Sequence, residues 1–272
     1  MSLPSPVEGT RPPWSIPPST AGLAGAFARD GYLVLRRVVD RRRLASLTEE
    51  LVAEFSRASA AGELFSGGGL LSGHLNCFPG TPSRFAFDAL RERGVLKQVR
   101  ELWPDATRLP NIGCNFNLPG SCEQNVHVDG YAARPFIVAN VATVDTTLEN
   151  GAMEAIPGSH LRPYKYWQLA LSDLPRVRIE LEAGDVLIRP STLWHRGMPN
   201  RTRACRPMLA FTWENGGSEL ADPYARNAGR ITFLPNRYTR DLSGNMREFA
   251  FAALPRVGSA YLFLRSLFSS SH

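Results

Sequence analysis

The strongest constraint on the fold is a series of short extended segments that fills the middle of the chain. Pairs of turn-forming residues, such as Pro119-Gly120 and Pro157-Gly158, separate these segments. Short strands at regular spacing with turns between them are typical of β-sandwiches and jelly rolls. The sequence therefore predicts a mainly β fold, with extended segments near residues 109–118, 125–131, 135–144, 152–157, 177–182, 185–189 and 206–214.

Helical patterns flank this region on both sides. Apolar residues recur at helical spacing from about residue 19 to residue 59, with one extended piece at 32–35. Further helices are expected near 94–103, 164–171 and 246–252. Residues 1–18 are rich in proline and predict a flexible arm. We therefore expect a single domain over residues 19–272, in which a jelly-roll core at about 109–214 carries N-terminal and C-terminal helices.

Charge and cysteine content argue against several classes of protein. The chain has 272 residues and a formal net charge of +6, and its arginines are scattered except for a cluster between Arg36 and Arg43. A helical pattern follows this cluster, so we expect an exposed helix entrance rather than a nucleic-acid site. The four cysteines form no CxxC pair, and neither a secretory signal nor a membrane-spanning apolar stretch is visible. We expect a cytoplasmic location, with no nucleic-acid partner and no membrane partner.

A histidine and an aspartate stand two positions apart in one of the extended segments, as His127 and Asp129. Residues i and i+2 of a strand project from the same face, so their imidazole nitrogen and carboxylate oxygen can converge on one metal ion. His195 is the best candidate for a third ligand. Two histidines and one carboxylate on one face of an iron(II) ion leave three positions open, enough for a bidentate 2-oxo acid and dioxygen.

An arginine follows eleven residues after His195 and opens another extended segment. Alternation along this segment places four residues on one face: Arg206, Met208, Ala210 and Thr212. An arginine held near the metal is suited to grip the distal carboxylate of 2-oxoglutarate through two parallel hydrogen bonds. We assign this role to Arg206 and only a weak one to Thr212, which lies further along the same face.

Together these elements resemble the phytanoyl-CoA dioxygenase family. The resemblance spans roughly residues 20 to 215 and rests on the HxD pair at 127–129, Asn150-Gly151-Ala152 running into Ile156-Pro157-Gly158-Ser159-His160, the distal His195, and Arg206. It implies a double-stranded β-helix of cupin-like type, with iron(II) held by His127, Asp129 and His195. It also implies a dioxygenase that binds 2-oxoglutarate through Arg206 and uses dioxygen to oxidise a small molecule.

Two positions qualify the resemblance. Members of the family often carry a serine two residues after the distal histidine, where this chain has Gly197. Another group must therefore take the place of that hydroxyl. Related halogenases replace the aspartate of the HxD pair by a small residue, and because Asp129 is present we do not expect halogenation.

The expected substrate follows from a closer resemblance. Residues 73–80 and 194–201 resemble the subgroup that acts on oligosaccharide antibiotics in orthosomycin and hygromycin biosynthesis. This resemblance implies oxidation of a C–H bond in a sugar-containing or other polar secondary metabolite. The product is either an alcohol or a new ring, such as an orthoester. Three residues are expected to contact the substrate, namely His74, Asn115 and Trp194.

Three alternatives remain open at this point. A hydroxylase of acyl-CoA or of another small molecule would belong to the same family. A zinc hydrolase would use the same three ligands and would need a general base, for which Glu154 is the nearest acidic residue in the sequence. A non-catalytic jelly-roll protein that only binds its partner would be free to lose the three metal ligands and Arg206. All four residues are present, which argues against this alternative.

Overall fold

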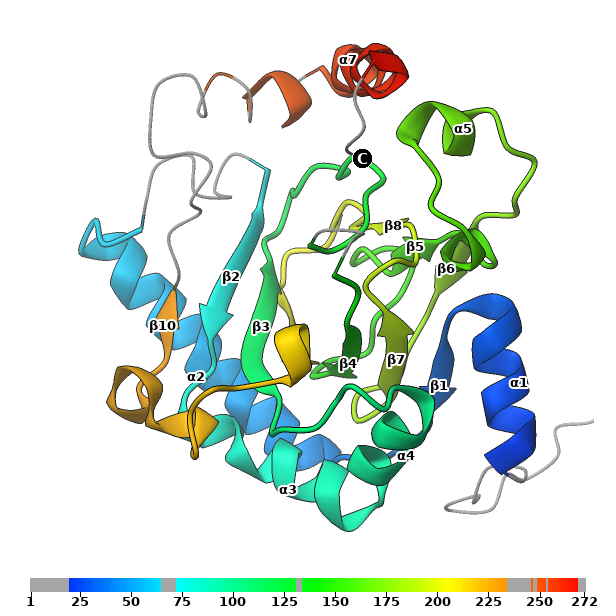
Figure 1. The fold of residues 1–272 in the computed structure, drawn as a ribbon. Coiled ribbons are helices and arrows are strands. Elements are labelled where there is room, and N and C mark those ends of the chain that lie inside the picture. Colours follow the sequence, from blue (N-terminus) through cyan, green and yellow to red (C-terminus); the bar gives the residue numbers. More distant parts are fainter. Residues whose placement is uncertain are drawn as a thin grey trace, which may run out of the picture.

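Two antiparallel sheets form the centre of the molecule (Figure 1). The structure is a computed structural model that describes residues 20–64, 72–130, 134–233, 246, 249–252 and 254–268. The large sheet has the strand order β1-β7-β4-β9-β3-β2-β10, and the small sheet has the order β6-β5-β8. Along the chain the strands are β1 (Leu33–Leu35), β2 (His74–Phe78), β3 (Asn111–Asn117), β4 (Ile137–Ala142), β5 (Met153–Ala155), β6 (Val177–Ile179), β7 (Val186–Pro190), β8 (His195–Arg196), β9 (Arg206–Thr212) and β10 (Thr232–Phe233). The expected mainly β jelly-roll fold is confirmed.

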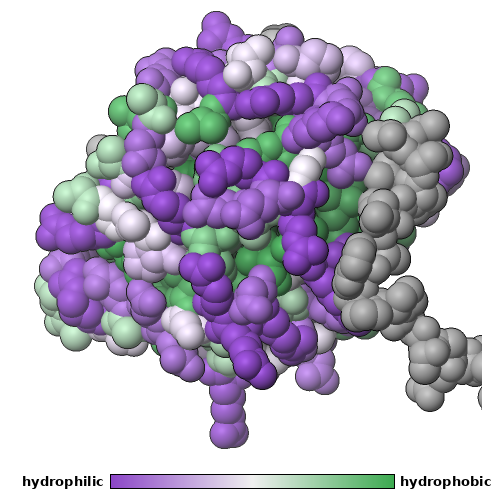
Figure 2. Space-filling view, turned by 90° about the horizontal axis from the view of Figure 1, so that it is seen from below, coloured by the Kyte–Doolittle hydropathy of each residue, from purple (hydrophilic) through white to green (hydrophobic). Residues whose placement is uncertain are grey.

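Helices flank the sheets, as the sequence predicts. They are α1 (Thr20–Asp30), α2 (Arg41–Ala60), α3 (Arg84–Glu92), α4 (Val95–Leu102), α5 (Tyr166–Ala170) and α7 (Pro255–Phe268). Buried side chains of α2, α3 and α4 join the core on the outer face of the large sheet. Figure 1 shows α3 and α4 below the strands, and α5 and α7 at the opposite end. From below, the surface is largely hydrophilic, as expected for the solvent faces of amphipathic helices (Figure 2).

The two ends of the chain are described only in part. The predicted arm at 1–18 lies outside the described residues. Within the predicted helix at 246–252, the residues that the structure describes are helical. No helix in the described part of the chain is long and apolar enough to cross a membrane.

Strand β9 separates the core from an inner cavity. Leu209 and Phe211 are fully buried in the core beneath the helices. The alternate residues line a cavity on the inner face of the sheet: Arg206, Met208, Ala210 and Thr212. The alternation predicted from the sequence is therefore confirmed, and it carries the guanidinium of Arg206 to the inside of the jelly roll.

The strand predicted at 125–131 is wrong in its extent. In the described part of this segment the only ladder contact is a single bridge between His127 and His195. The partner strand β8 is only two residues long, so it offers no further edge to pair with. Two residues later the chain is held by a different contact, in which the Asp129 N–H donates to the Ser191 carbonyl at 2.9 Å.

The arginine cluster between Arg36 and Arg43 pairs with acidic residues of the same chain. Arg36 Nη1 donates to Asp185 Oδ2 at 2.6 Å, and Arg41 Nη2 donates to Asp145 Oδ2 at 2.6 Å. Helix α2 begins inside the cluster, as predicted. These pairs tie the start of α2 to the turns that precede β5 and β7.

We predict that Asp185→Ala lowers the free energy of unfolding by about 3 kcal/mol, because its buried carboxylate has three donors. These are Arg36 Nη1, the Arg37 N–H at 2.9 Å and the Glu182 N–H at 2.9 Å. Urea unfolding measures the loss. Asp88→Ala, which breaks an exposed pair with Arg91, is the matched control and should cost less than about 0.5 kcal/mol. Equal losses in the two variants would contradict the prediction.

Candidate metal centre and cavity

Three side chains from two segments converge on one point. The backbone N–H of His127 donates to the carbonyl of His195 at 2.9 Å, and the reverse bond is also 2.9 Å long. This pair of bonds holds the two segments side by side. The Nε2 atoms of His127 and His195 lie 3.8 Å and 3.7 Å from Asp129 Oδ1. The three ligand atoms all lie within 4.8 Å of one another, as a shared metal ion requires.

The tautomers of both histidines suit metal binding. His127 Nδ1 donates to the Asn125 carbonyl at 2.8 Å, and His195 Nδ1 donates to the Leu193 carbonyl at 2.9 Å. Because a carbonyl only accepts, Nδ1 carries a proton in each ring, which leaves Nε2 as the nitrogen that can bind a metal. Burial lowers the pKa of His195 to about 3, and the charge of Arg189 acts in the same direction. The His195 ring is therefore neutral at physiological pH.

Asp129 is ionised and has one oxygen free for a metal. Burial alone would raise the pKa of this carboxyl group, but the charge of Arg189 and its hydrogen bond lower it well below its ordinary value. Arg189 Nη2 donates to Asp129 Oδ2 at 2.6 Å. This leaves Oδ1 as the oxygen that faces the two histidines. Two imidazole nitrogens and one carboxylate oxygen form a donor set that fits iron(II).

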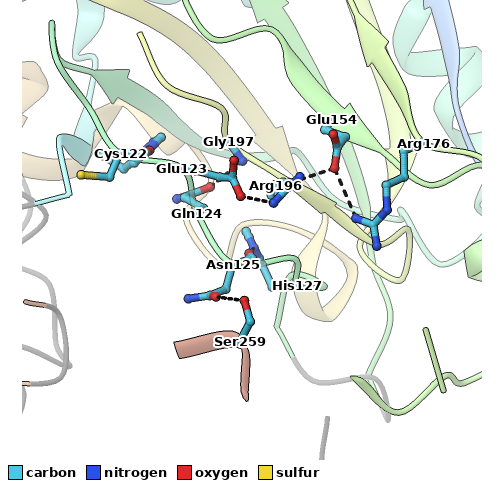
Figure 3. A network of polar contacts seen from close by, with 11 residues as sticks. Cys122, Glu123, Gln124, Asn125, His127, Glu154, Arg176, Arg196, Gly197 and Ser259 are labelled. Atoms are coloured by element: carbon cyan, nitrogen blue, oxygen red, sulfur yellow. Dashed lines mark hydrogen bonds and ion pairs between the residues drawn. The ribbon is translucent and has the colours of Figure 1, made fainter. Parts of the chain in front are cut away.

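Arg196 joins the two segments that carry the ligands (Figure 3). Its Nη1 pairs with Glu123, which lies four residues before His127, and its Nε donates to Glu154 Oε1 at 2.8 Å. Glu154 also accepts from Arg176 Nη1 at 3.3 Å. Because two arginines hold Glu154 and it does not line the cavity, it is poorly placed to serve as the base that a zinc hydrolase needs.

The ligands line a cavity of about 580 Å³ on the inner face of the large sheet. Its wall is rich in polar side chains, which include His74, Asn76, Asn115, Asn117, Gln124, Asn140, Thr212 and Glu214. Of the three residues expected to contact the substrate, His74 and Asn115 belong to this wall. Trp194 does not: its side chain packs in a separate apolar cluster with Ile156 and Leu169.

Arg206 is held by the Asn150-Gly151 turn. Its Nε donates to the Asn150 carbonyl at 3.1 Å, and burial lowers its pKa to about 10. The Asn150 side chain fixes the turn by accepting from the Thr147 N–H at 2.7 Å. Gly151 has a φ of +91°, and a Cβ there would lie 2.4 Å from the Met198 carbonyl oxygen. The turn therefore requires glycine at 151. The carbonyl of Asn150 in this turn fixes where the guanidinium of Arg206 enters the cavity.

Thr212 lies at the other end of β9 from Arg206. The two are six positions apart, which corresponds to about 20 Å along an extended strand. The two side chains therefore cannot hold the same carboxylate. In the sheet, Thr212 is in register with Val138, which is itself in register with Arg189. Thr212 thus belongs to the end of the cavity where Arg189 enters.

The space beside Gly197 is filled by two other side chains. A Cβ at this position would lie 2.6 Å from Gln124 Oε1 and 2.8 Å from His74 Cε1. Gln124 Oε1 accepts from the Gly197 N–H at 2.8 Å, and His74 Nε2 donates to the Cys122 carbonyl at 2.7 Å. Both side chains line the cavity. They occupy the place that a serine side chain at 197 would need.

Two residues of this site were not anticipated from the sequence. Arg189 is a charged residue at the end of an otherwise apolar strand, Val186-Leu187-Ile188, and that contrast is the signal that could have identified it. Gln124 gave no signal, because only its contact with Gly197 makes it part of the site.

Substitution of serine for Gly197 should destabilise the protein by about 1–3 kcal/mol, because a Cβ overpacks the contact with Gln124. Chemical denaturation of the metal-free protein measures the effect. The double variant Gln124→Ala with Gly197→Ser removes the nearer of the two obstructing side chains and should recover part of the loss. No recovery would show that the crowding comes from elsewhere.

A second prediction concerns pH. Burial lowers the pKa of His74 to about 4, so the unfolded chain binds a proton at this residue where the folded chain does not. Stability should therefore fall as the pH drops from about 6.5 towards 4. We compare the free energy of unfolding of the metal-free protein at about pH 7.5 and pH 5. Its fall between these two values should be about 2 kcal/mol smaller in His74→Gln than in wild type. Denaturant unfolding at the two pH values tests this, and identical losses in wild type and variant would contradict it.

Solved structures share this fold. SnoN is a non-haem α-ketoglutarate dependent epimerase from nogalamycin biosynthesis, and it is 24% identical with a TM-score of 0.51 over 71% of this chain and 81% of its own. SnoN has also been solved with Fe3+, α-ketoglutarate and nogalamycin RO. AviO1 from Streptomyces viridochromogenes is 21% identical with a TM-score of 0.55 over 73% of this chain and 96% of its own. At these identities the likeness shows the fold.

Sequence comparison shows the family. The dioxygenase swnH1 of Metarhizium robertsii is 28% identical over 223 residues, which are 70% of this chain and 69% of swnH1. The family model described as phytanoyl-CoA dioxygenase matches residues 27–208, more than half of the chain. The expected cofactors, iron(II) and 2-oxoglutarate, agree with this match and with the cluster of two histidines and one aspartate. This chain belongs to the phytanoyl-CoA dioxygenase family.

Proposed function

We propose that this protein is an iron(II) and 2-oxoglutarate dependent oxygenase that oxidises a C–H bond of a polar, sugar-containing secondary metabolite. The observation that carries the proposal is the convergence of His127, Asp129 and His195 in a cavity that Arg206 also lines. Membership of the dioxygenase family supports the class of reaction. A cytoplasmic location is part of the same proposal.

Each charged or metal-binding residue has a defined task in this proposal. His127 and His195 present Nε2, and Asp129 presents Oδ1, to the iron. Arg206 reaches the cavity with its Nε already bonded to the Asn150 carbonyl, so its terminal nitrogens are the part of the fork that meets the distal carboxylate of 2-oxoglutarate. When bound, iron and 2-oxoglutarate activate dioxygen, and the chain contributes orientation and exclusion of water.

Gln124 takes the place of the missing serine hydroxyl. Its Oε1 is committed to the Gly197 N–H, which leaves its amide nitrogen to donate to an oxygen in the cavity. His74 packs beside it and is neutral at physiological pH. We therefore assign the second contact to the distal carboxylate to Gln124.

The cavity wall favours a substrate with many hydroxyl groups. Amide side chains of Asn76, Asn115 and Asn140 both donate and accept hydrogen bonds, as recognition of a sugar requires. Hydroxylation and oxidative ring closure begin with the same attack on a C–H bond, and both fit this wall. An acyl-CoA substrate is less favoured, because Arg36 and Arg41 are paired with acidic residues instead of forming a phosphate site.

The first experiment is anaerobic titration of metal-free protein with iron(II) and then with 2-oxoglutarate. We expect a weak visible charge-transfer band that needs both additions. His195→Ala should abolish the band. Arg206→Ala should keep it but raise the 2-oxoglutarate concentration needed by roughly 10- to 100-fold, the loss expected when a buried charged partner is removed.

Arg203→Ala is the matched control for Arg206→Ala. Arg203 is exposed and only three residues away in sequence, so its removal changes the charge without changing the cavity. The control should titrate like wild type. A folded wild-type protein that gives no band would overturn the proposed function.

A further inference from the structure

A second buried guanidinium enters the cavity beside the metal position. Arg189 is 5% exposed, and its contact with Asp129 uses only Nη2. Its Nε and Nη1 are buried and have no hydrogen-bond partner among the described residues. Buried N–H groups of a charged side chain are strongly destabilising when unpaired, so this pair of donors calls for an oxygen ligand that enters the cavity.

The register of the large sheet places this guanidinium well away from Arg206. Arg189 is in register with Val138, and Val138 is in register with Thr212. Thr212 and Arg206 are the two ends of β9, about 20 Å apart along the strand. The charge of Arg189 also lowers the pKa of Asp129 and His195, whereas that of Arg206 lowers the pKa of His74. Arg189 therefore lies at the metal and Arg206 lies at the far end.

The charge balance also calls for an anion. The charged residues that line the cavity are Asp129, Arg189, Arg206 and the exposed Glu214. Apart from Glu214, two buried arginines oppose one half-buried aspartate and leave one positive charge. A divalent metal and a dianionic 2-oxoglutarate cancel each other, so only a further carboxylate, on the substrate, would neutralise this excess, whereas the keto-acid carboxylate would satisfy the free N–H groups of Arg189. A bound metal would also share the charge of Asp129 and leave Arg189 less well compensated.

We propose that Arg189, with Thr212 in the same row of the sheet, forms a second carboxylate-binding site beside the metal, separate from Arg206; this inference rests on the proposed function. Nη2 orients Asp129, while Nε and Nη1 receive the carboxylate. The hydroxyl of Thr212 faces the same end of the cavity. The carboxylate is either the one next to the keto group of 2-oxoglutarate or one on the substrate.

Binding to Mn(II)-loaded protein tests the site without turnover. Arg189→Lys keeps a cation to hold Asp129 but loses the two free donors. Saturating Mn(II), checked by electron paramagnetic resonance, separates this effect from a change in metal affinity. Three probes are used: 2-oxoglutarate, pyruvate and acetate. Pyruvate keeps the keto acid but lacks the distal carboxylate. Acetate is added to the complex of the protein with Mn(II) and 2-oxoglutarate. Calorimetry gives each dissociation constant.

Two outcomes support the site and identify its ligand. If it holds the keto-acid carboxylate, Arg189→Lys weakens 2-oxoglutarate and pyruvate by the same factor, roughly tenfold or more, whereas Arg206→Gln weakens only 2-oxoglutarate. If it holds a substrate carboxylate, both keto acids bind normally and acetate binding is weakened by roughly tenfold or more. Thr212→Val should weaken the same ligand to a smaller degree.

Unchanged affinities for all three probes in Arg189→Lys would overturn the inference and leave Arg189 as a partner of Asp129 alone. Arg203 is exposed and does not line the cavity, so Arg203→Lys serves as the control for substitution of arginine by lysine. Failure of wild-type protein to bind Mn(II) and 2-oxoglutarate would instead overturn the proposed function, so the two failures are distinguishable.

Discussion

The pair of backbone hydrogen bonds between His127 and His195 is the contact on which the site depends. It aligns two segments that are 68 residues apart in the chain and makes two imidazoles neighbours, with ring centroids 4.7 Å apart. The contact is short, because β8 has only two residues, and the ion pairs of Arg196 reinforce it from outside the cavity. Ligand geometry is therefore set by backbone pairing and supported by charge, while the core beneath the helices supplies the stability of the sheet.

Charge is distributed along the cavity rather than concentrated at one point. Two buried arginines line the cavity at opposite ends of the β9 row, and one of them, Arg189, contacts the single carboxylate of the metal position. Each arginine is tied by one nitrogen to the protein, Arg189 to a carboxylate and Arg206 to a carbonyl. This arrangement restricts the orientation of a guanidinium while leaving donors for a ligand, and it lowers the loss of side-chain freedom when the ligand binds.

Much of the site was predictable from the sequence, because its key residues lie in local patterns. The HxD pair needs only the two-residue periodicity of an extended segment, and Arg206 needs only the alternation along β9. Trp194 was misjudged in spite of the same rule: it is adjacent to His195, so alternation already directs it away from the cavity. Arg189 and Gln124 were missed because their roles depend on sheet register and on a contact across 73 residues, which no local pattern contains.

The crowding at Gly197 has a consequence for how such a site can change. Positions 74, 124 and 197 come from three distant segments but occupy one volume, with atoms that leave no room for a single added carbon. A larger residue at one of them requires a smaller residue at another, so their substitutions are epistatic. A variant library that enlarges position 197 alone would contain destabilised proteins, whereas one that changes the three positions together can exchange one set of hydrogen-bond donors for another.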